Sequence, residues 1–455
     1  MSSEHEAYAA YRRACERAYR YGMEWSTAAR TVIEQYRDPL NELNGFPVPD
    51  RDTGSNLAYT LRALTEEFER GMGQILRGTF ADYTSEVPFS DPSSSGKGVQ
   101  VPGLAHLWVC LGEVYERAVV RATRAARGNS GTLLCAWALE AVRTYWDLPG
   151  SLARELGGRV GDLPLVRALE DDAARMVKGW EHHSEGVPSG EASRQFEYAL
   201  AEARAMAYAA ERIRATVGES MVPSTMLSVM VELARLDLYY DFEEPAGGSS
   251  RRLKRTRRAA ILRALERTAQ CPPAPHLAGS VDAGALGFYL AVVHSNPGWK
   301  GATLGEGQVR RLLTPAVATN GASSVAAESA DTVCAGDGVV SGAQITVGGS
   351  GGECSRMSSP EGEGESGWEL MGTLRCEPLA MTQLRLELEG MGDSLLITPL
   401  DVSAGLWAVH VHVPNIAAAR TLILSYGEWG DERISSLAGG QHRDSSCGEP
   451  GEVHA

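Results

Sequence analysis

The spacing of hydrophobic positions divides the chain into a long helical part and a short mixed part. From residue 5 to about 320, Ala, Leu, Arg and Glu dominate, and apolar residues recur at helical spacing, as Leu57, Leu61 and Leu64 do. Stretches rich in proline, glycine and serine predict surface loops at 85–103 and 243–258, where the basic run 251–258 is typical of a solvated helix start. We therefore expect residues 1–320 to form an all-α domain.

The pattern changes twice towards the C-terminus. Residues 321–366 are small, polar and glycine-rich, which predicts a flexible linker. In 367–437, strand patterns (WELMGTLRC, DSLLITPLD, LWAVHVHV, ERISSL) and helix patterns (LAMTQLRLELEGMG, IAAARTLILSYGEWG) follow in the split βαβ order. We expect a multi-domain chain, all-α followed by a small α+β domain, with a disordered tail at 438–455.

Composition narrows the class of protein. The chain has 455 residues and a formal net charge of −15, so its overall field does not favour nucleic acid. We find no long apolar run and no secretory signal, and the eight cysteines form no CxxC pair that would indicate a zinc knuckle or a disulfide framework. We expect a cytoplasmic protein with no transmembrane segment and no nucleic-acid partner.

The stretch FPVPDRDTGSN, 46–56, carries the first candidate chemistry. Its prolines hold the backbone extended, and alternate residues then point to one side, so Asp50 and Asp52 can converge on one cation. A helix pattern follows, whose first turn offers hydroxyl and N–H groups to an anion from Thr53, Gly54, Ser55 and Asn56. Metal beside anion is the layout of a Mg–nucleotide site, although two turn-forming aspartates are equally compatible with this pattern.

Three further turns open helix patterns in the same part of the chain. They contain Gly128, Asn129, Ser130 and Gly131; Thr225 and Met226; and Asp282, Ala283 and Gly284. Each alone is typical of a helix cap. Gathered at one end of a helical domain, they would surround a polyanion with N–H donors and helix dipoles.

Together these motifs resemble the DhaL-like domain of the dihydroxyacetone kinase superfamily, and most closely the fatty acid kinase A group of DAK2-domain proteins. NELNGFPVPDRDTGSN is similar to that group's N-x-L-N-x-F-P-V-P-D-G-D-T-G-T-N, and GNSG, PSTMLSV and GSVDAGALGF follow in the family's order. The resemblance implies an antiparallel helical barrel that holds ATP and Mg²⁺.

The resemblance also implies a role for each motif. Asp50 and Asp52 would be metal ligands and catalytic, with Asn44 near the metal. Residues 53–56 and 129–130 would contact phosphates, Met226 would lie at the base side, and 282–284 would close over the nucleotide. Gly128, Gly131 and Thr225 belong to the same nucleotide-binding turns. Three residues depart from the family pattern: Arg51, which replaces a glycine, and Pro223 and Ser224 before Met226.

The C-terminal pattern resembles the middle domain of the same group. His410 and His412 are two apart on a predicted strand, so they share one face, opposite Val409 and Val411. An HxH pair binds zinc when a third ligand arrives. Glu369 stands where much of the family has a cysteine, so the resemblance predicts a Glu369–His410–His412 zinc site. Two solvent-facing histidines are the alternative.

The resemblance implies an ATP- and Mg²⁺-dependent kinase subunit. Its acceptor would be a fatty acid carried by a separate DegV-like protein, because the chain after residue 438 is too short for the group's C-terminal DegV-like domain. The alternatives are a dihydroxyacetone (glycerone) kinase and a non-catalytic, nucleotide-binding regulatory protein. A homodimer is compatible with each.

Overall fold

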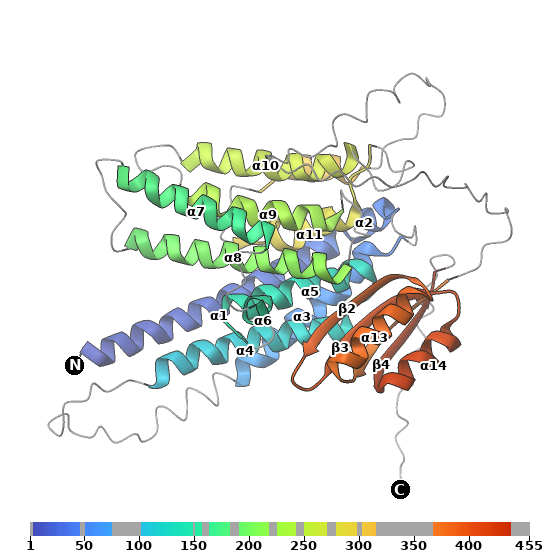
Figure 1. Ribbon diagram of the computed structural model, residues 1–455. Coiled ribbons are helices and arrows are strands. Elements are labelled where there is room, and N and C mark those ends of the chain that lie inside the picture. The colour runs from blue at the N-terminus through green and yellow to red at the C-terminus, as the bar shows by residue number, and fades with distance from the viewer. Residues whose placement is uncertain are drawn as a thin grey trace, which may run out of the picture.

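The computed structural model describes residues 3–45, 51–74, 102–148, 151–156, 163–182, 191–217, 225–242, 250–270, 279–297, 303–314 and 367–437. Up to residue 314 these ranges are helical, and near the C-terminus they form one four-stranded sheet with two helices (Figure 1). The predicted linker 321–366, the predicted tail 438–455 and most of the predicted loop 85–103 lie outside these ranges. Within them, we find no helix that combines the length and the apolar character needed to cross a membrane.

The N-terminal part consists of helices that pack around a shared apolar core. Their bounds are α1 (Ser3–Gln35), α2 (Arg37–Leu43), α3 (Thr53–Gln74), α4 (Pro102–Ala125), α5 (Gly128–Tyr145), α6 (Leu152–Leu156), α7 (Pro164–His182), α8 (Glu191–Val217), α9 (Met226–Phe242), α10 (Ser250–Gln270), α11 (Ala283–Phe288) and α12 (Glu306–Leu312), with a π-helical segment at Tyr289–His294. The predicted leucine stripe of α3 is buried, from Leu57 through Leu61 to Leu64. The helical prediction is thus confirmed for the described residues.

One predicted loop is shorter than the sequence indicated. Helix α10 begins at Ser250, so the basic run 251–258 lies in its first turns, as expected of a helix start, and the loop predicted for 243–258 ends before Ser250. Arginine and lysine are good helix formers, and their charges can remain in water on an outer face.

The C-terminal part has the predicted order of strands and helices. Its elements are β1 (Trp368–Arg375), α13 (Pro378–Glu389), β2 (Asp393–Asp401), β3 (Leu406–Val413), α14 (Ile416–Tyr426) and β4 (Glu428–Ser436). The sheet order is β2-β3-β1-β4 with antiparallel neighbours, so β3 lies between β1 and β2, as the split βαβ order requires.

The last boundary differs from the prediction, because α14 ends at Tyr426 and the residues GEWG belong to the turn and strand β4. Gly427 explains the difference. A Cβ at Gly427 would lie 2.1 Å from the carbonyl oxygen of Arg375, so only glycine lets the chain approach β1 this closely.

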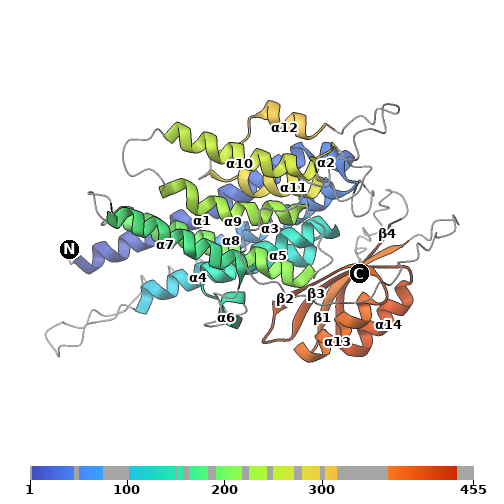
Figure 2. The same ribbon diagram turned by 45° about the horizontal axis from the view of Figure 1, so that its top comes forward.

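Both faces of the sheet are covered. On one face Leu370, Val409 and Val411 pack with buried residues of α13 and α14. On the other face Leu400 and Ala408 belong to the same apolar core as the N-terminal helices. Figure 2 shows the sheet between the helical part and the pair α13–α14. The face that carries His410 and His412 is therefore turned towards the helical part and not towards water.

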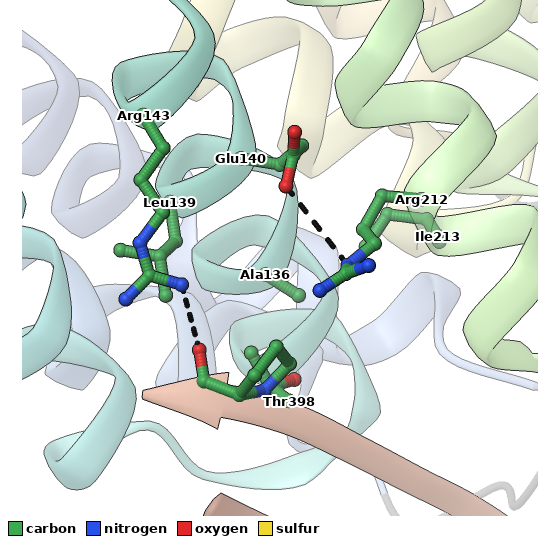
Figure 3. A pocket seen from close by; sticks show the side chains of 8 residues that line it. Ala136, Leu139, Glu140, Arg143, Arg212, Ile213 and Thr398 are labelled. Carbon is green, nitrogen blue, oxygen red and sulfur yellow. Dashed lines mark hydrogen bonds and ion pairs between the residues drawn. The ribbon is translucent and has the colours of Figure 1, made fainter. Parts of the chain in front are cut away.

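A buried arginine fastens α5 to the end of strand β2. Arg143 donates hydrogen bonds to the carbonyl oxygens of Pro399, at 2.9 Å, and Leu400, and it forms an ion pair with Glu116 of α4 at 2.7 Å. Figure 3 shows Arg143 reaching from α5 to β2, with Glu140 and Arg212 directed towards each other beside it. Helix α5 therefore connects the predicted phosphate turn at its first residues with the sheet at its last turn.

Candidate functional site

The first predicted motif opens helix α3. The helix begins at Thr53, directly after Asp52, as predicted, and its first turn is held to α2 by Asn41. The Asn41 side chain accepts a hydrogen bond from the Ser55 N–H at 3.1 Å and donates one to the Ser55 hydroxyl at 3.0 Å. Thr53, Gly54 and Asn56 are buried and Asp52 is half-buried. Asp50 lies outside the described residues, so the convergence of the two carboxylates stays a prediction.

The residue between the two aspartates adopts a conformation that favours glycine. Arg51 has a φ of 58°, in the left-handed region that L-residues rarely occupy. The glycine of the family pattern would fit this backbone without strain. Arg51 thus adds an exposed cation while the loop keeps the conformation that a glycine would favour.

The second motif opens α5 and lies against the first. Gly128, the first residue of α5, has a φ of 60°, and a Cβ there would lie 2.1 Å from Nδ2 of Asn56. Glycine is required both by the backbone conformation and by this close approach. Asn56 and Gly128 are 72 positions apart in the sequence. The fold brings the starts of α3 and α5 together, as predicted.

The third and fourth motifs meet at Asp282. Its side chain caps α11 by accepting a hydrogen bond from the Ala285 N–H at 2.7 Å, and it also accepts one from the Met226 N–H at the start of α9. Its own N–H donates to the Thr268 hydroxyl of α10 at 3.0 Å. Burial raises the pKa of Asp282 to about 6, opposed by these two backbone hydrogen bonds. Asp282 thus joins the starts of α9 and α11.

A single glycine shows how closely the motifs converge. A Cβ at Gly284 would lie 3.3 Å from Oδ1 of Asp282 and 3.5 Å from both Cε of Met226 and Oγ of Ser130. We call this group, with the first turns of α3 and α5, the helix-start cluster. Of the other predicted residues, Asn44 and Ala283 are buried, Asn129 and Thr225 are half-buried, and Gly131 is buried in the first turn of α5.

The predicted zinc ligands also come together, on the inner face of the sheet. Glu369 of β1 lies opposite His412 of β3, and His410 is the next residue on the same face of β3. One donor atom from each of Glu369, His410 and His412 lies within 4.8 Å of the other two. Oε1 of Glu369 is 3.1 Å from Nε2 of His410. We call these three residues the metal group.

The metal group is buried, so the alternative of solvent-facing histidines is wrong. His410 is 1 % exposed, His412 6 % and Glu369 7 %. The helices α4 and α5 cover this face, with Thr123 and Thr132 beside His410. The hydrophobic alternation of strand β3 identifies one apolar face, but it cannot show that a second layer, far away in the sequence, covers the other.

The electrostatics of the metal group fit a cation. Burial opposes ionisation of Glu369, but the interaction with His410, whose Nε2 lies 3.1 Å away, supported by His412 and Ser435, lowers its pKa to about 2. Within the described part of the chain, neither ring nitrogen of His410 has a well-directed hydrogen bond. Two imidazoles and one carboxylate are a donor set that zinc accepts, leaving a fourth tetrahedral position.

Sequence reasoning missed the residues that fasten the two parts together. Glu140 and Arg143 are 3 % exposed and lie three apart in the apolar helix pattern of α5. Two charges of opposite sign within that pattern are a signal that could have predicted a buried polar contact. Asn41, which fixes the first turn of α3, carries no comparable signal.

Comparison with known proteins bears on the C-terminal part. Residues 365–444 match the family model of the middle domain of FakA-like fatty acid kinase subunits. This range contains the sheet, α13, α14 and all three residues of the metal group. No curated protein matches the chain. The match supports a relationship to the fatty acid kinase A-like family, whereas the DhaL-like identity of the helical part stays a prediction.

Proposed function

We propose that the chain is the nucleotide-binding subunit of a fatty acid kinase, which uses ATP and Mg²⁺ to phosphorylate a fatty acid presented by a partner protein. One observation carries the proposal: Ser130, Met226 and Asp282, from three separate helix starts, meet at Gly284. The C-terminal match to a fatty acid kinase subunit supports the choice of acceptor.

The chain's own residues have distinct tasks in this proposal. Asp50 and Asp52, with Asn44 nearby, would hold Mg²⁺, which supplies neutralisation of the charge on the phosphates. The N–H groups in the first turns of α3 and α5 would orient the phosphate oxygens. Met226 would lie at the base side, and the cap formed by Asp282 would keep α9 and α11 in register.

The reaction would be an in-line transfer. A carboxylate oxygen of the fatty acid attacks the γ-phosphorus, the bond from that phosphorus to the bridging oxygen of ADP breaks, and acyl phosphate and ADP result. Catalysis in such a site is mainly positioning and charge stabilisation. The matched family is described as a subunit, which supports a separate partner protein. We propose that this partner is DegV-like and carries the fatty acid.

Zinc would have a different place in the molecule. Glu369, His410 and His412 would hold it on the inner face of the sheet, where it would supply a structural bond between β1 and β3. The buried donor atoms and the lowered pKa of Glu369 support this assignment.

Replacement of Asp52 tests the catalytic proposal. In ATP-turnover assays with the carrier that co-purifies from the source cell, Asp52→Ala should lower the rate by roughly a hundredfold or more, because a metal carboxylate acts in the transition state. Asp38→Ala is the matched control, since Asp38 is an exposed aspartate of α2 paired with Arg37.

Three results would redirect the proposal. Equal turnover by the native protein and Asp52→Ala would exclude a catalytic role for this loop. Mg-dependent ATP binding without turnover would favour the alternative of a non-catalytic regulatory protein that binds nucleotide. Turnover with dihydroxyacetone in place of the fatty acid carrier would indicate the glycerone kinase reaction.

A further inference from the structure

A cleft lies between the inner face of the sheet and the junction of α4 and α5. It is lined by Thr123 and Arg124 of α4, Thr132 of α5, His410 of β3 and Arg433 of β4. Its enclosed part has room for about one water-sized group, and the roughly 260 Å³ of unfilled space around that part includes open solvent. Because α4 and α5 supply one wall and the sheet the other, it exists only when the helical part and the sheet are in contact.

Arg433 is the unusual residue of this cleft. It comes from the edge strand β4, opposite Met371 of β1, and its Nε atom is buried. In the part of the chain that the structure describes, its guanidinium makes no hydrogen bond and no ion pair within 4 Å. Burial lowers the pKa of Arg433, and the positive charge of Arg127 lowers it further, while Glu369 and Asp431 oppose this.

Two more arginines lie near the same place without an acidic partner. Arg124 is exposed on the rim of the cleft, so its side chain has room to turn. Arg127 precedes the first residue of α5, and its guanidinium carbon stacks 4.0 Å from the ring centre of Tyr59. Among the described residues, neither forms an ion pair. Three arginines that form no ion pair with a described residue therefore lie near one another, although Glu369 and Asp431 attract Arg433 from a longer distance.

The electrostatics indicate which ligand would suit this cleft. Arg433 is half-buried with its Nε withdrawn from water, and proteins normally pair a cation that loses part of its hydration. The positive end of the α5 dipole adds to the repulsion. Guanidinium groups form their strongest hydrogen bonds with carboxylate and phosphate oxygens. An oxyanion would therefore relieve the repulsion among these groups.

The cleft also lies close to the helix-start cluster. Oγ of Ser130, in the first turn of α5, lies 3.5 Å from where a Cβ at Gly284 would be, whereas Thr132, half a turn further on, lines the cleft. The two places are thus on different sides of one helix, separated by roughly the 10 Å width of a helix.

We propose that this cleft binds a carboxylate or phosphate oxyanion between the helical part and the sheet, with Arg433 and Arg124 as its main contacts. The choice of anion rests on the proposed function. The anion is either the carboxylate head of the acceptor or a phosphate group, and the two share the same recognition by guanidinium.

Titration of the full chain with inorganic phosphate, acetate and octanoate at constant ionic strength tests this site. Arg433→Gln should weaken binding by roughly tenfold or more, the effect expected of a charge-assisted hydrogen bond, and Arg124→Gln by a smaller factor. Arg420→Gln should bind like the native protein, because Arg420 lies on α14 and pairs with Glu432.

The three anions distinguish the source. Binding of phosphate alone would assign the cleft to a phosphate group, and stronger binding of octanoate than of acetate would assign it to an acyl carboxylate. The proposal is overturned if the native protein binds none of the three, or if Arg433→Gln and Arg124→Gln both bind them as the native protein does. If Arg433→Gln does not fold, Arg433→Lys replaces it and should still weaken binding, by a smaller factor, because an ammonium group cannot form the paired hydrogen bonds of a guanidinium.

A Mg·ATP titration of the same samples separates this proposal from the kinase proposal. Arg433→Gln should keep the native affinity for Mg·ATP, because Arg433 lies outside the helix-start cluster. If the protein binds the anions but not Mg·ATP, the kinase proposal is contradicted and the anion-site proposal stands. If it binds Mg·ATP but none of the anions, only the anion-site proposal is contradicted.

Discussion

The helix-start cluster and the metal group are two candidate sites that consist of different chemical groups. In the cluster, the converging groups are backbone N–H donors and short side chains, and closeness is achieved by Gly128 and Gly284. In the metal group, three long polar side chains approach one another on a rigid pair of strands. Main-chain donors do not depend on the identity of each side chain, whereas the metal group depends on each of its three residues.

The pKa of a buried carboxyl group also differs between the two sites. Burial raises the pKa of Asp282 to about 6, and only neutral N–H donors oppose it. Glu369 is also buried, but its histidine neighbours bring its pKa down to about 2. The comparison indicates that Asp282 acts as a cap between two helices, and that Glu369 is placed to share a positive charge.

The largest expected effect is on zinc. Protein purified without added metal should contain one zinc per chain, and His410→Ala should contain essentially none, because only two donors of the predicted set would remain. His294→Gln, a histidine outside the metal group, should keep its zinc. Elemental analysis measures the zinc content of each protein. Native protein without stoichiometric zinc would contradict the proposed zinc site.

The contact between the two parts should produce the next largest effect. Arg143→Met should lower the free energy of unfolding by about 3 kcal/mol, because Glu116 and two strand carbonyl groups lose a buried partner. Arg154→Met removes an exposed pair with Asp147 and should cost less than about 1 kcal/mol. Denaturant unfolding compares the two variants. Equal losses of unfolding free energy would show that the contacts of Arg143 between α5 and β2 contribute little to stability.

A glycine substitution tests how far the helix-start cluster depends on its backbone. Gly128→Ala should cost about 1–2 kcal/mol for the left-handed conformation alone, and it should weaken Mg·ATP binding, since the new Cβ meets Asn56. Gly307→Ala is the control, because a Cβ there meets no atom within 4 Å. Native Mg·ATP affinity in Gly128→Ala would argue against a nucleotide at this helix start.

The last expected effect is a change in how stability depends on pH, which appears only as a slope within a limited pH range. Burial raises the pKa of Glu140 to about 7 from 4.5, opposed first by Arg212. The folded state then keeps a proton that the unfolded chain loses, so this group's contribution to stability falls as pH rises from about 4.5 to 7 and is constant above. Glu140→Gln should flatten that slope in unfolding experiments, and Glu170→Gln, at an exposed pair, should leave it unchanged.

Local patterns predicted the helix starts and the strand order well. The helices begin at Thr53, Gly128, Met226 and Ala283, where the turns placed them, because caps and glycines act within a few residues. The element order of 367–437 was also readable, since strand alternation and helical spacing are local signals.

The second layer over the sheet could not be predicted from local patterns. Arg143 meets Pro399 across 256 positions of the chain, and His410 is buried by helices equally remote in sequence. Nothing within a short window of residues distinguishes a histidine that faces water from one that faces another domain. For the same reason, the isolation of Arg433 becomes visible only when α4, α5 and the sheet are seen together.

A crystal structure with Mg²⁺ and a non-hydrolysable ATP analogue tests the central claim most directly. We expect the triphosphate to contact the first turns of α3 and α5, with the metal on Asp50 and Asp52 and the analogue bordered by Met226 and Gly284. An analogue bound elsewhere, or a chain that binds no nucleotide while the helix starts remain packed as they are, would contradict the account.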